Sequence, residues 1–327
     1  MAKSARIVVG LSLLLGACGG TTPPPATQDK EPLPALEEGA AKDSPEVQKG
    51  KNAIEAKDFA GARAIFEGIV AKTPKDAIAL HYLGVALEGL NDLEGAAAKY
   101  RAALEAKPDL TDSAVNLSAL LISAQRYAEA IALLQPLVAK IPRDPLLHLN
   151  LAFALTQTKD FEGAIKEYKA ALASGPEPTA QIGLADALVS AGKNAEATDL
   201  LKKMLAGNPE SVEVLATIAD LFRNLDAYAD CVAAYDKAIE KKPAAQLYTE
   251  RGVCRRGVKD HAGAKADYLK ATELDPRYGP AWYLLGQHLW AIEHKKPEAL
   301  KAFDECAKVA PQSKCKQAAD ALRAGKN

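Results

Sequence analysis

The chain has 327 residues, of which 48% are hydrophobic and 25% charged, and its formal net charge is −1. A near-neutral chain without a basic patch lacks the cation surplus that tracks a phosphate backbone, so the composition argues against nucleic-acid binding. After residue 16 no apolar run approaches the ~20 residues that a transmembrane helix needs.

Residues 1–17 have the features of a secretory signal peptide. A basic start precedes the apolar run Ile7–Leu15, which is too short to span a bilayer, and the segment ends in the letters LGAC. These letters resemble a bacterial lipobox. The resemblance implies that Cys18 becomes the first mature residue and carries thioether-linked diacylglycerol and an amide-linked acyl chain such as palmitate. Ordinary cleavage nearby, leaving Cys18 as a free thiol, is the alternative. Residue Gly19, in place of Asp, implies the outer membrane by the sorting rule of enteric lipoproteins.

Residues 18–43, which begin with this cysteine, are rich in Pro, Gly and Thr and have few large apolar side chains. Such a composition cannot bury a core and predicts a disordered tether. If extended at about 3.1 Å per residue, it reaches ~80 Å from the membrane.

Residues 44–311 repeat a pattern of about 34 residues. Small side chains lie twelve residues before each repeat's proline and large apolar or aromatic ones lie eight before it, as Ala96 and Tyr100 show for Pro108. Small residues let two antiparallel helices approach, large ones fill the space beside them, and the proline ends the pair. Eight prolines mark the period, at intervals of 33 to 35 residues: Pro74, Pro108, Pro142, Pro176, Pro209, Pro243, Pro276 and Pro311.

This pattern resembles the tetratricopeptide repeat (TPR) family. Trp282, Leu285 and Gly286 stand close to the family's W-x2-L-G signature. The resemblance implies an all-α TPR solenoid, a right-handed superhelix of about eight antiparallel helix pairs. Ser44 is expected to cap the first helix. Residues 312–327 are expected to form a capping helix with one small apolar face.

Four cysteines follow Cys18, and their placement suggests pairs. In the implied fold, two helices run antiparallel about each proline turn, so residues equidistant from the turn lie at the same height. Cys231 lies 12 residues before the proline of its turn and Cys254 lies 11 after it, and Cys306 and Cys315 lie 5 before and 4 after theirs. We hypothesise disulfides Cys231–Cys254 and Cys306–Cys315. Small buried thiols are the alternative.

The search for catalytic chemistry finds no pattern that indicates an enzyme. The five histidines are scattered, and His288 and His294 are six residues apart, so they do not share one helical face. The sequence has no glycine-rich phosphate loop, and no Cys-x2-Cys spacing that indicates a metal site. We therefore expect no catalytic residue, no metal, no cofactor and no small-molecule substrate.

The TPR resemblance implies that the first helix of each pair, helix A, lines a concave groove that holds an extended peptide or a helix. Asn116 and Asn150 occupy the same groove position one repeat apart, where an amide can pair with a peptide backbone. A structural role for both asparagines within the repeats is the alternative. The expected groove residues are His81, Val85, Val115, Asn116, Ile122, Leu149, Asn150, Phe153, Ile182, Tyr283 and Trp290.

These features together predict a lipid-anchored, periplasm-facing TPR scaffold that binds protein partners at a Gram-negative outer membrane. By resemblance to TPR lipoproteins, a pilotin-like role in assembling a secretin for a type IV pilus or secretion system ranks first. An adaptor for peptidoglycan hydrolases, another envelope or motility complex, and a purely structural envelope protein are the alternatives.

Overall fold

The structure is a computed structural model that describes residues 44–310 and 314–325. The predicted signal peptide, the lipidated Cys18 and the tether lie outside these residues. Within them the protein is all-α, with seventeen α-helices and no strand. The chain forms two compact units, residues 1–187 and 188–327, and each is described by itself.

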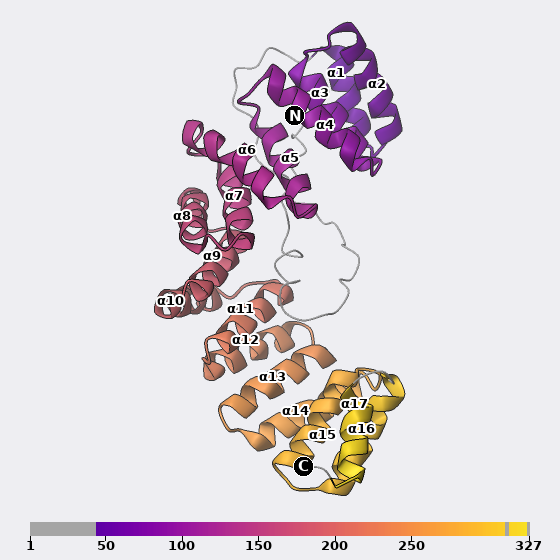
Figure 1. Cartoon of the computed structure of the whole chain (residues 1–327), viewed down its shortest axis with the longest axis vertical. Coiled ribbons are helices and arrows are strands. Elements are labelled where there is room, and N and C mark those ends of the chain that lie inside the picture. The colour runs from indigo at the N-terminus through magenta and orange to yellow at the C-terminus, as the bar shows by residue number, and fades with distance from the viewer. Residues whose placement is uncertain (1–43, 311–313, 326–327) are drawn as a thin grey trace. The chain divides into compact units, whose positions relative to one another are not determined.

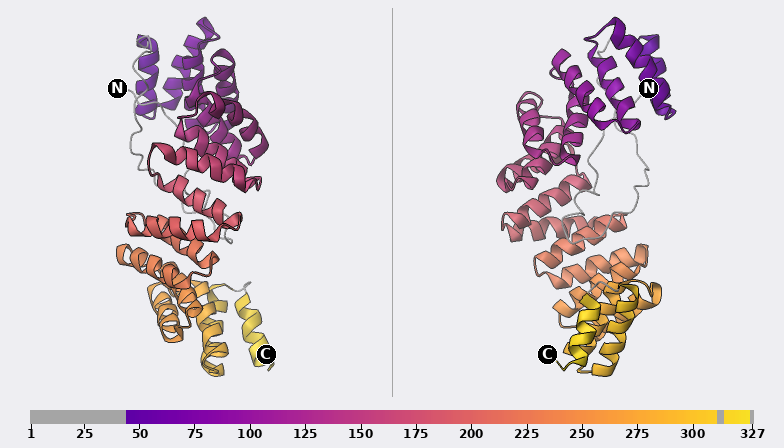
Figure 2. Two further views of the ribbon diagram at one scale, coloured as in Figure 1. Left: turned by 90° about the vertical axis from the view of Figure 1, so that its left-hand side faces the viewer. Right: turned by 45° about the vertical axis from the view of Figure 1, so that its right-hand side comes forward.

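Unit 1 is a stack of antiparallel helix pairs, with the two helices of each pair side by side (Figures 1 and 2). Helix α9 (Pro178–Ser190) contains the boundary between the units. The paired helices are α1 (Pro45–Glu55) with α2 (Phe59–Lys72), α3 (Ala77–Gly89) with α4 (Leu93–Ala106), α5 (Thr111–Ser123) with α6 (Tyr127–Lys140), and α7 (Pro145–Gln157) with α8 (Phe161–Ala171), which the short 3₁₀ helix η3 (Leu172–Ser174) follows.

Unit 2 repeats the arrangement and ends in a single helix, α17 (Lys314–Arg323), which packs on α16 (Figure 1). This helix lies within the segment 312–327 where a capping helix was expected. The other helices of unit 2 are α10 (Asn194–Ala206), α11 (Val212–Asn224), α12 (Tyr228–Lys241), α13 (Ala245–Gly257), α14 (His261–Leu274), α15 (Gly279–Ala291) and α16 (Lys296–Val309).

The helices begin and end as local chemistry dictates. Ser44 caps α1, as the sequence predicted, because its Oγ accepts the Val47 N–H at 3.2 Å. Four second helices begin with an aspartate that accepts the N–H of a glycine three residues later, in the pairs Asp58–Gly61, Asp92–Gly95, Asp160–Gly163 and Asp260–Gly263. A Cβ at Gly61 would lie 2.2 Å from the Asp58 carboxylate, so a larger residue there would displace this capping side chain.

The turn inside each pair has one residue with positive φ, and it recurs with the period of the repeat. Only one of the eight is glycine, so the sequence pattern does not reveal the position. The eight residues are Lys57, Asn91, Gln125, Lys159, Gly192, Asp226, Lys259 and His294.

The core of each pair is a close contact between a small residue of the first helix and a large residue of the second. Tyr100 is fully buried, and a Cβ on Gly84 would lie 2.6 Å from its ring. Three further pairs, Gly50–Phe66, Gly252–Tyr268 and Gly286–Phe303, repeat this contact with a ring atom 2.5–2.7 Å from the added Cβ. The small and large positions of the period are therefore the two halves of one packing contact.

We predict that Gly84→Ala lowers the free energy of unfolding of the protein by about 1–3 kcal/mol, because the new methyl group must displace the Tyr100 ring in a filled core. Urea unfolding followed by circular dichroism measures the change.

Gly68→Ala in α2 is the matched control. No atom lies within 4 Å of a Cβ at Gly68, so this change should stabilise its helix by about 0.5–1 kcal/mol. Equal and stabilising effects of both changes would contradict the proposed contact.

Candidate functional site

The structure buries nine of the eleven side chains that were expected to line an open groove. Phe153, Ile122 and Val85 belong to one hydrophobic cluster that runs through unit 1. First helices of neighbouring pairs contact each other, as α5 does α7, so side chains on this face pack between helices. The groove prediction assumed that these side chains are exposed to solvent, but the structure buries them. The nine buried residues are His81, Val85, Val115, Asn116, Ile122, Leu149, Asn150, Phe153 and Ile182.

The two asparagines are used inside the fold. Asn150 Nδ2 donates to Ser118 Oγ at 2.8 Å and to the Val115 carbonyl at 3.2 Å. Asn116 Nδ2 donates to the Tyr100 hydroxyl at 3.2 Å, and that hydroxyl donates to Glu88. These contacts agree with the alternative interpretation, in which both asparagines have a structural role within the repeats, because each amide links one helix to its neighbour.

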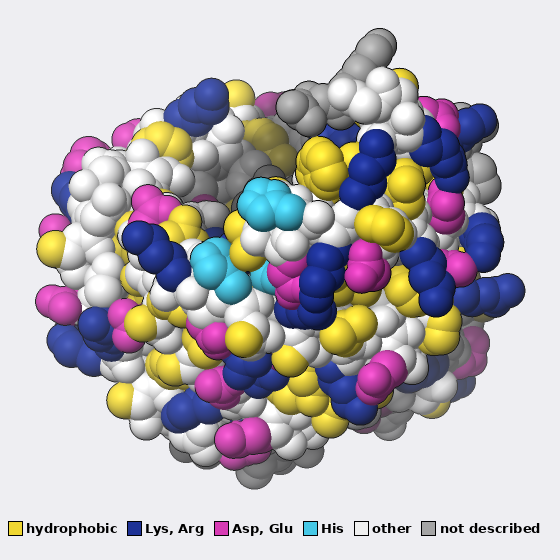
Figure 3. Space-filling model, turned by 90° about the horizontal axis from the view of Figure 1, so that it is seen from below, with side chains coloured by type: hydrophobic (Ala, Val, Ile, Leu, Met, Phe, Trp, Pro, Cys, Tyr) yellow, Lys and Arg dark blue, Asp and Glu magenta, His cyan; other side chains and the backbone are white. Residues whose placement is uncertain are grey.

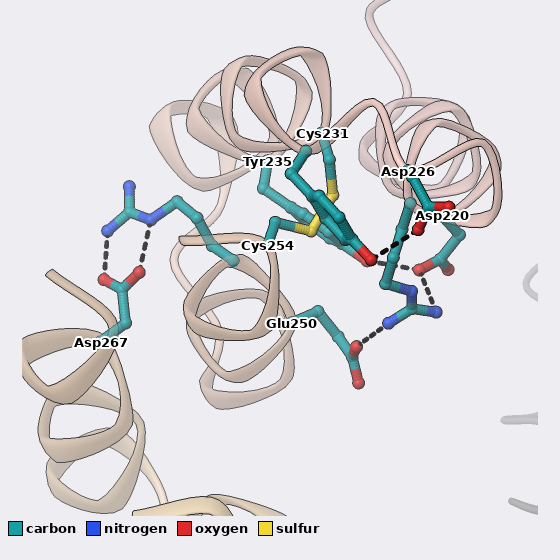
Figure 4. The surroundings of a disulfide bond; sticks show 10 residues. Asp220, Asp226, Cys231, Tyr235, Glu250, Cys254 and Asp267 are labelled. Atoms are coloured by element: carbon teal, nitrogen blue, oxygen red, sulfur yellow. Dashed lines mark hydrogen bonds and ion pairs between the residues drawn. A yellow bond between two sulfur atoms is a disulfide. The ribbon is translucent and has the colours of Figure 1, made fainter. Parts of the chain in front are cut away.

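Unit 2 carries polar helix faces, and most of their charges are paired. Arg223 forms ion pairs with Asp220 and Glu250, and Tyr235 donates to the same Asp220 at 2.7 Å (Figure 4). Burial raises the pKa of the Glu250 carboxyl, which the Arg223 guanidinium partly offsets. This network braces α11 against α12 and α13.

The Cys231–Cys254 disulfide lies next to this network and links α12 to α13 (Figure 4). Its Cα atoms are 6.0 Å apart, and those of Cys306 and Cys315, which link α16 to α17, are 5.7 Å apart. Both spacings suit disulfides. The structure thus has the two pairs that the symmetry about the proline turns suggested.

Peptide mapping of the protein purified without reductant should recover Cys231 linked to Cys254 and Cys306 linked to Cys315. Replacing both Cys231 and Cys254 by Ala should lower the free energy of unfolding by about 2–4 kcal/mol, because the cross-link no longer restricts the unfolded chain. Recovery of four unmodified thiols would contradict both pairings.

Tyr283 and Trp290, the two remaining groove residues, lie on a cavity of about 490 Å³. Both side chains are partly exposed and come from α15, as does Gln287, whose Nε2 donates to the Tyr283 hydroxyl at 3.1 Å. Helix α16 adds Phe303 to the wall and α17 adds Leu322. The cavity is therefore built by the last helix pair and the terminal helix, with Arg256 of α13 at its edge.

His288 also lines this cavity, and the fold brings it close to a histidine that is distant in the sequence. Its ring lies 6.2 Å from the ring of His261 and 6.2 Å from that of Tyr268, measured between centroids. Neither ring nitrogen of His288 has a hydrogen-bond partner in the described part of the chain, and Nε2 lies 3.6 Å from Glu293 Oε1. Figure 3 shows histidine side chains gathered on this end of unit 2, beside Lys and Arg.

Burial favours the neutral form of His288. Burial is the largest effect and lowers the pKa of His288; the Glu293 carboxylate opposes it, and the nearby His261, Lys265 and Arg256 lower the pKa further. Hydrogen bonds from Lys295 and Lys265 lower the pKa of Glu293 to about 2. Glu293 is thus already engaged by two lysines.

We predict that unit 2 loses stability as the pH falls below the ordinary histidine pKa of about 6.5. His288 has a lowered pKa in the folded state, so the unfolded chain binds more protons, and the free energy of unfolding falls by up to about 1.4 kcal/mol per pH unit. Urea unfolding between pH 7.5 and 5 of the wild-type protein and of His288→Leu measures the effect, and the variant should show a flatter slope.

His294→Asn provides the control, since His294 is exposed and Asn tolerates its positive φ of 57°. This variant should keep the wild-type slope. A His288→Leu protein with an unchanged pH slope would exclude His288 as the titrating group.

Sequence reasoning missed the histidine pair and the cavity. The two histidines lie on antiparallel neighbours, His261 at the start of α14 and His288 near the end of α15. The symmetry argument that paired the cysteines applies loosely to them, because they lie 15 residues before and 12 after Pro276. The cavity depends on how α17 packs, and the repeat pattern of the sequence does not predict that packing.

The helix pairs and their packing agree with comparisons to known proteins. Models of the tetratricopeptide repeat match residues 47–110, 121–187, 182–246 and 245–278. The chain belongs to the tetratricopeptide repeat family. Its repeats indicate a protein–protein interaction scaffold, and proteins of this fold are typically not enzymes.

Curated relatives match this chain only in part. Human protein O-mannosyl-transferase TMTC3 is 29% identical over 184 residues, which is 50% of this chain and 20% of that protein. Small glutamine-rich tetratricopeptide repeat-containing protein 2 of Mycosarcoma maydis is 30% identical over 87 residues, 26% of this chain and 24% of that protein. The chain therefore spans a quarter or less of either relative.

Solved structures support the fold. A tetratricopeptide repeat protein from Parabacteroides merdae has a TM-score of 0.55 at 18% identity and covers 75% of this chain and 97% of its own. Yeast Tom70 has a TM-score of 0.50 at 18% identity and covers 89% of this chain and 66% of its own. None of the helices within the described ranges is long and apolar enough to cross a membrane.

Proposed function

We propose that this protein is a lipid-anchored, periplasm-facing TPR scaffold that binds protein partners and aids assembly of an outer-membrane complex. Within that class we favour a pilotin-like role toward a secretin of a type IV pilus or secretion system. An adaptor for peptidoglycan hydrolases, or for another envelope or motility complex, is the second candidate, and a purely structural envelope protein is the third.

The cavity in unit 2 is the observation that supports partner binding most directly. Tyr283 and Trp290 are partly exposed there, and aromatic side chains of this kind anchor protein segments because they combine a large apolar surface with a polar group. Gln287 adds an amide that a peptide can use. Two solenoid-type units linked to a membrane by residues 18–43 would hold this cavity in the periplasm.

The anchor is supported by the sequence alone, through the signal-like segment 1–17, the letters LGAC and the tether that follows. A diacylglycerol together with an amide-linked chain exceeds the single acyl chain that binds a membrane only marginally. Anchoring and partner capture can be tested separately.

In cells, the wild-type protein should partition into the detergent phase of a Triton X-114 extraction, and Cys18→Ala should move it to the aqueous phase without changing its circular dichroism. The acyl chains then account for the membrane attachment. Wild-type protein found in the aqueous phase would exclude the anchor.

Crosslinking of the tagged, lipidated protein in cells, followed by mass spectrometry, tests the partner. We expect secretin subunits to be enriched over a sample from cells that express Cys18→Ala. Enrichment of peptidoglycan enzymes would move the proposal to the adaptor role. A sample that contains only the protein itself would contradict the scaffold proposal and favour a structural role.

A further inference from the structure

We infer that the cavity of unit 2 binds a bulky apolar side chain of an acidic partner segment, with Arg256 pairing with a carboxylate of that segment. This inference rests on the proposed function as a scaffold and names the chemistry of the segment that the scaffold recognises.

The walls of the cavity suit one large apolar side chain. Tyr283 and Trp290 stand on one side, and the Tyr283 ring lies 5.9 Å from that of the buried Phe303. Ile292 at the rim is 39% exposed, which adds apolar surface around the opening. A volume of about 490 Å³ lies within the range of binding pockets, roughly 300–1,000 Å³. It can accept an aromatic side chain together with the adjoining backbone.

The wall that α17 contributes is held in place before any ligand arrives. Helix α17, which supplies Leu322, is joined to α16 by the Cys306–Cys315 disulfide. Near its other end Arg323 pairs with both oxygens of Asp304 at 2.5 and 2.7 Å. A wall fixed at both ends lowers the ordering cost of binding.

Arg256 is the cation that distinguishes the cavity. The other two arginines of its helix, Arg251 and Arg255, both pair with Asp267. Within residues 44–310 and 314–325 Arg256 has no ion-pair or hydrogen-bond partner, although it lines the cavity. A carboxylate of a bound segment would supply the partner that its guanidinium lacks among these residues.

The charged residues behind the cavity wall also favour an acidic partner segment. Glu293, which lies 3.6 Å from His288, is shared by Lys265 at 2.9 Å and Lys295 at 2.8 Å. Two lysines on one carboxylate leave a positive excess, which adds to that of Arg256. This end of unit 2 therefore complements an acidic segment and repels a basic one.

The charge on the cavity lining indicates that the occupant carries a polar group. His288 also lines the cavity, but it is 1% exposed and both of its ring nitrogens are buried, so Arg256 is the charged group that an occupant can reach. A lipid acyl chain would fill the apolar walls but would bring no carboxylate to Arg256. A peptide brings amides and a carboxylate together with its apolar side chain.

Fluorescence anisotropy with labelled synthetic peptides tests the inference on the mature full-length protein in detergent. The probe is a seven-residue peptide with Trp flanked by two Glu on each side (GEEWEEG). Two comparison peptides replace the Trp by Ala or the four Glu by Lys. We expect saturable binding of the acidic Trp peptide, weakened at least ten-fold by 0.5 M NaCl, and at least ten-fold weaker binding of both comparison peptides.

Arg256→Gln should weaken binding of the acidic Trp peptide at least ten-fold, and Trp290→Ala should do the same. Trp290→Phe should retain most of the binding, and the circular dichroism of Trp290→Ala should match that of the wild type, which excludes misfolding as the cause of its loss. Lys301→Gln is the matched control, because it removes the same charge from the exposed face of α16, away from the cavity, and should bind as the wild type does.

Equal binding of the Lys and Glu peptides, or unchanged binding by Arg256→Gln, would overturn the inference. The crosslinking experiment separates this failure from failure of the scaffold proposal. If Arg256→Gln/Trp290→Ala captures the same partners as the wild type, the scaffold stands and the cavity is not its recognition site. If the peptide binds as expected but the wild type captures no partner in cells, the cavity inference stands and the scaffold proposal fails.

Discussion

The contact between a small residue of one helix and a large residue of its partner is the constraint on which the structure depends. Gly84 has no Cβ, so the Tyr100 ring can lie against its backbone, and the same contact recurs along the chain. It fixes how closely each pair of helices approaches. The fully buried Cys231 occupies a slot that is alanine in the other repeats, so the same spacing places its sulfur within reach of Cys254.

Because this packing buries the facing sides of the helices, the surfaces left for binding lie at the edges of the helix pairs. In unit 1 neighbouring first helices pack against each other. The amide nitrogen of Asn150 donates hydrogen bonds to the Val115 carbonyl and to the Ser118 hydroxyl. In unit 2 most arginines are paired, whereas Arg256 and the exposed Arg277 have no ion-pair partner among the described residues, and of these two Arg256 lines the cavity. The cavity forms where the last pair, α15 and α16, meets α17.

Much of the fold could be predicted from the sequence, because the 34-residue period records packing that is local within a pair. Small and large residues at fixed distances before each proline predicted the helix pairs, and Ser44 predicted the first cap. The candidate site was predicted only in part. Tyr283 and Trp290 lie on the cavity, whereas Arg256 was not among the expected groove residues and the adjacency of His288 to His261 was not foreseen.

The sequence by itself determined the family, the helix pairs and the pairing of cysteines about the proline turns, since each follows from short-range order along the chain. It also carries the only information on the signal-like segment, Cys18 and the tether. The tertiary structure decided which of the expected groove residues remain accessible, because that depends on the helix that packs against each one. Asn116 is buried beside Tyr100 of the preceding helix, and Phe153 lies in the cluster of unit 1, whereas Trp290 stays partly exposed.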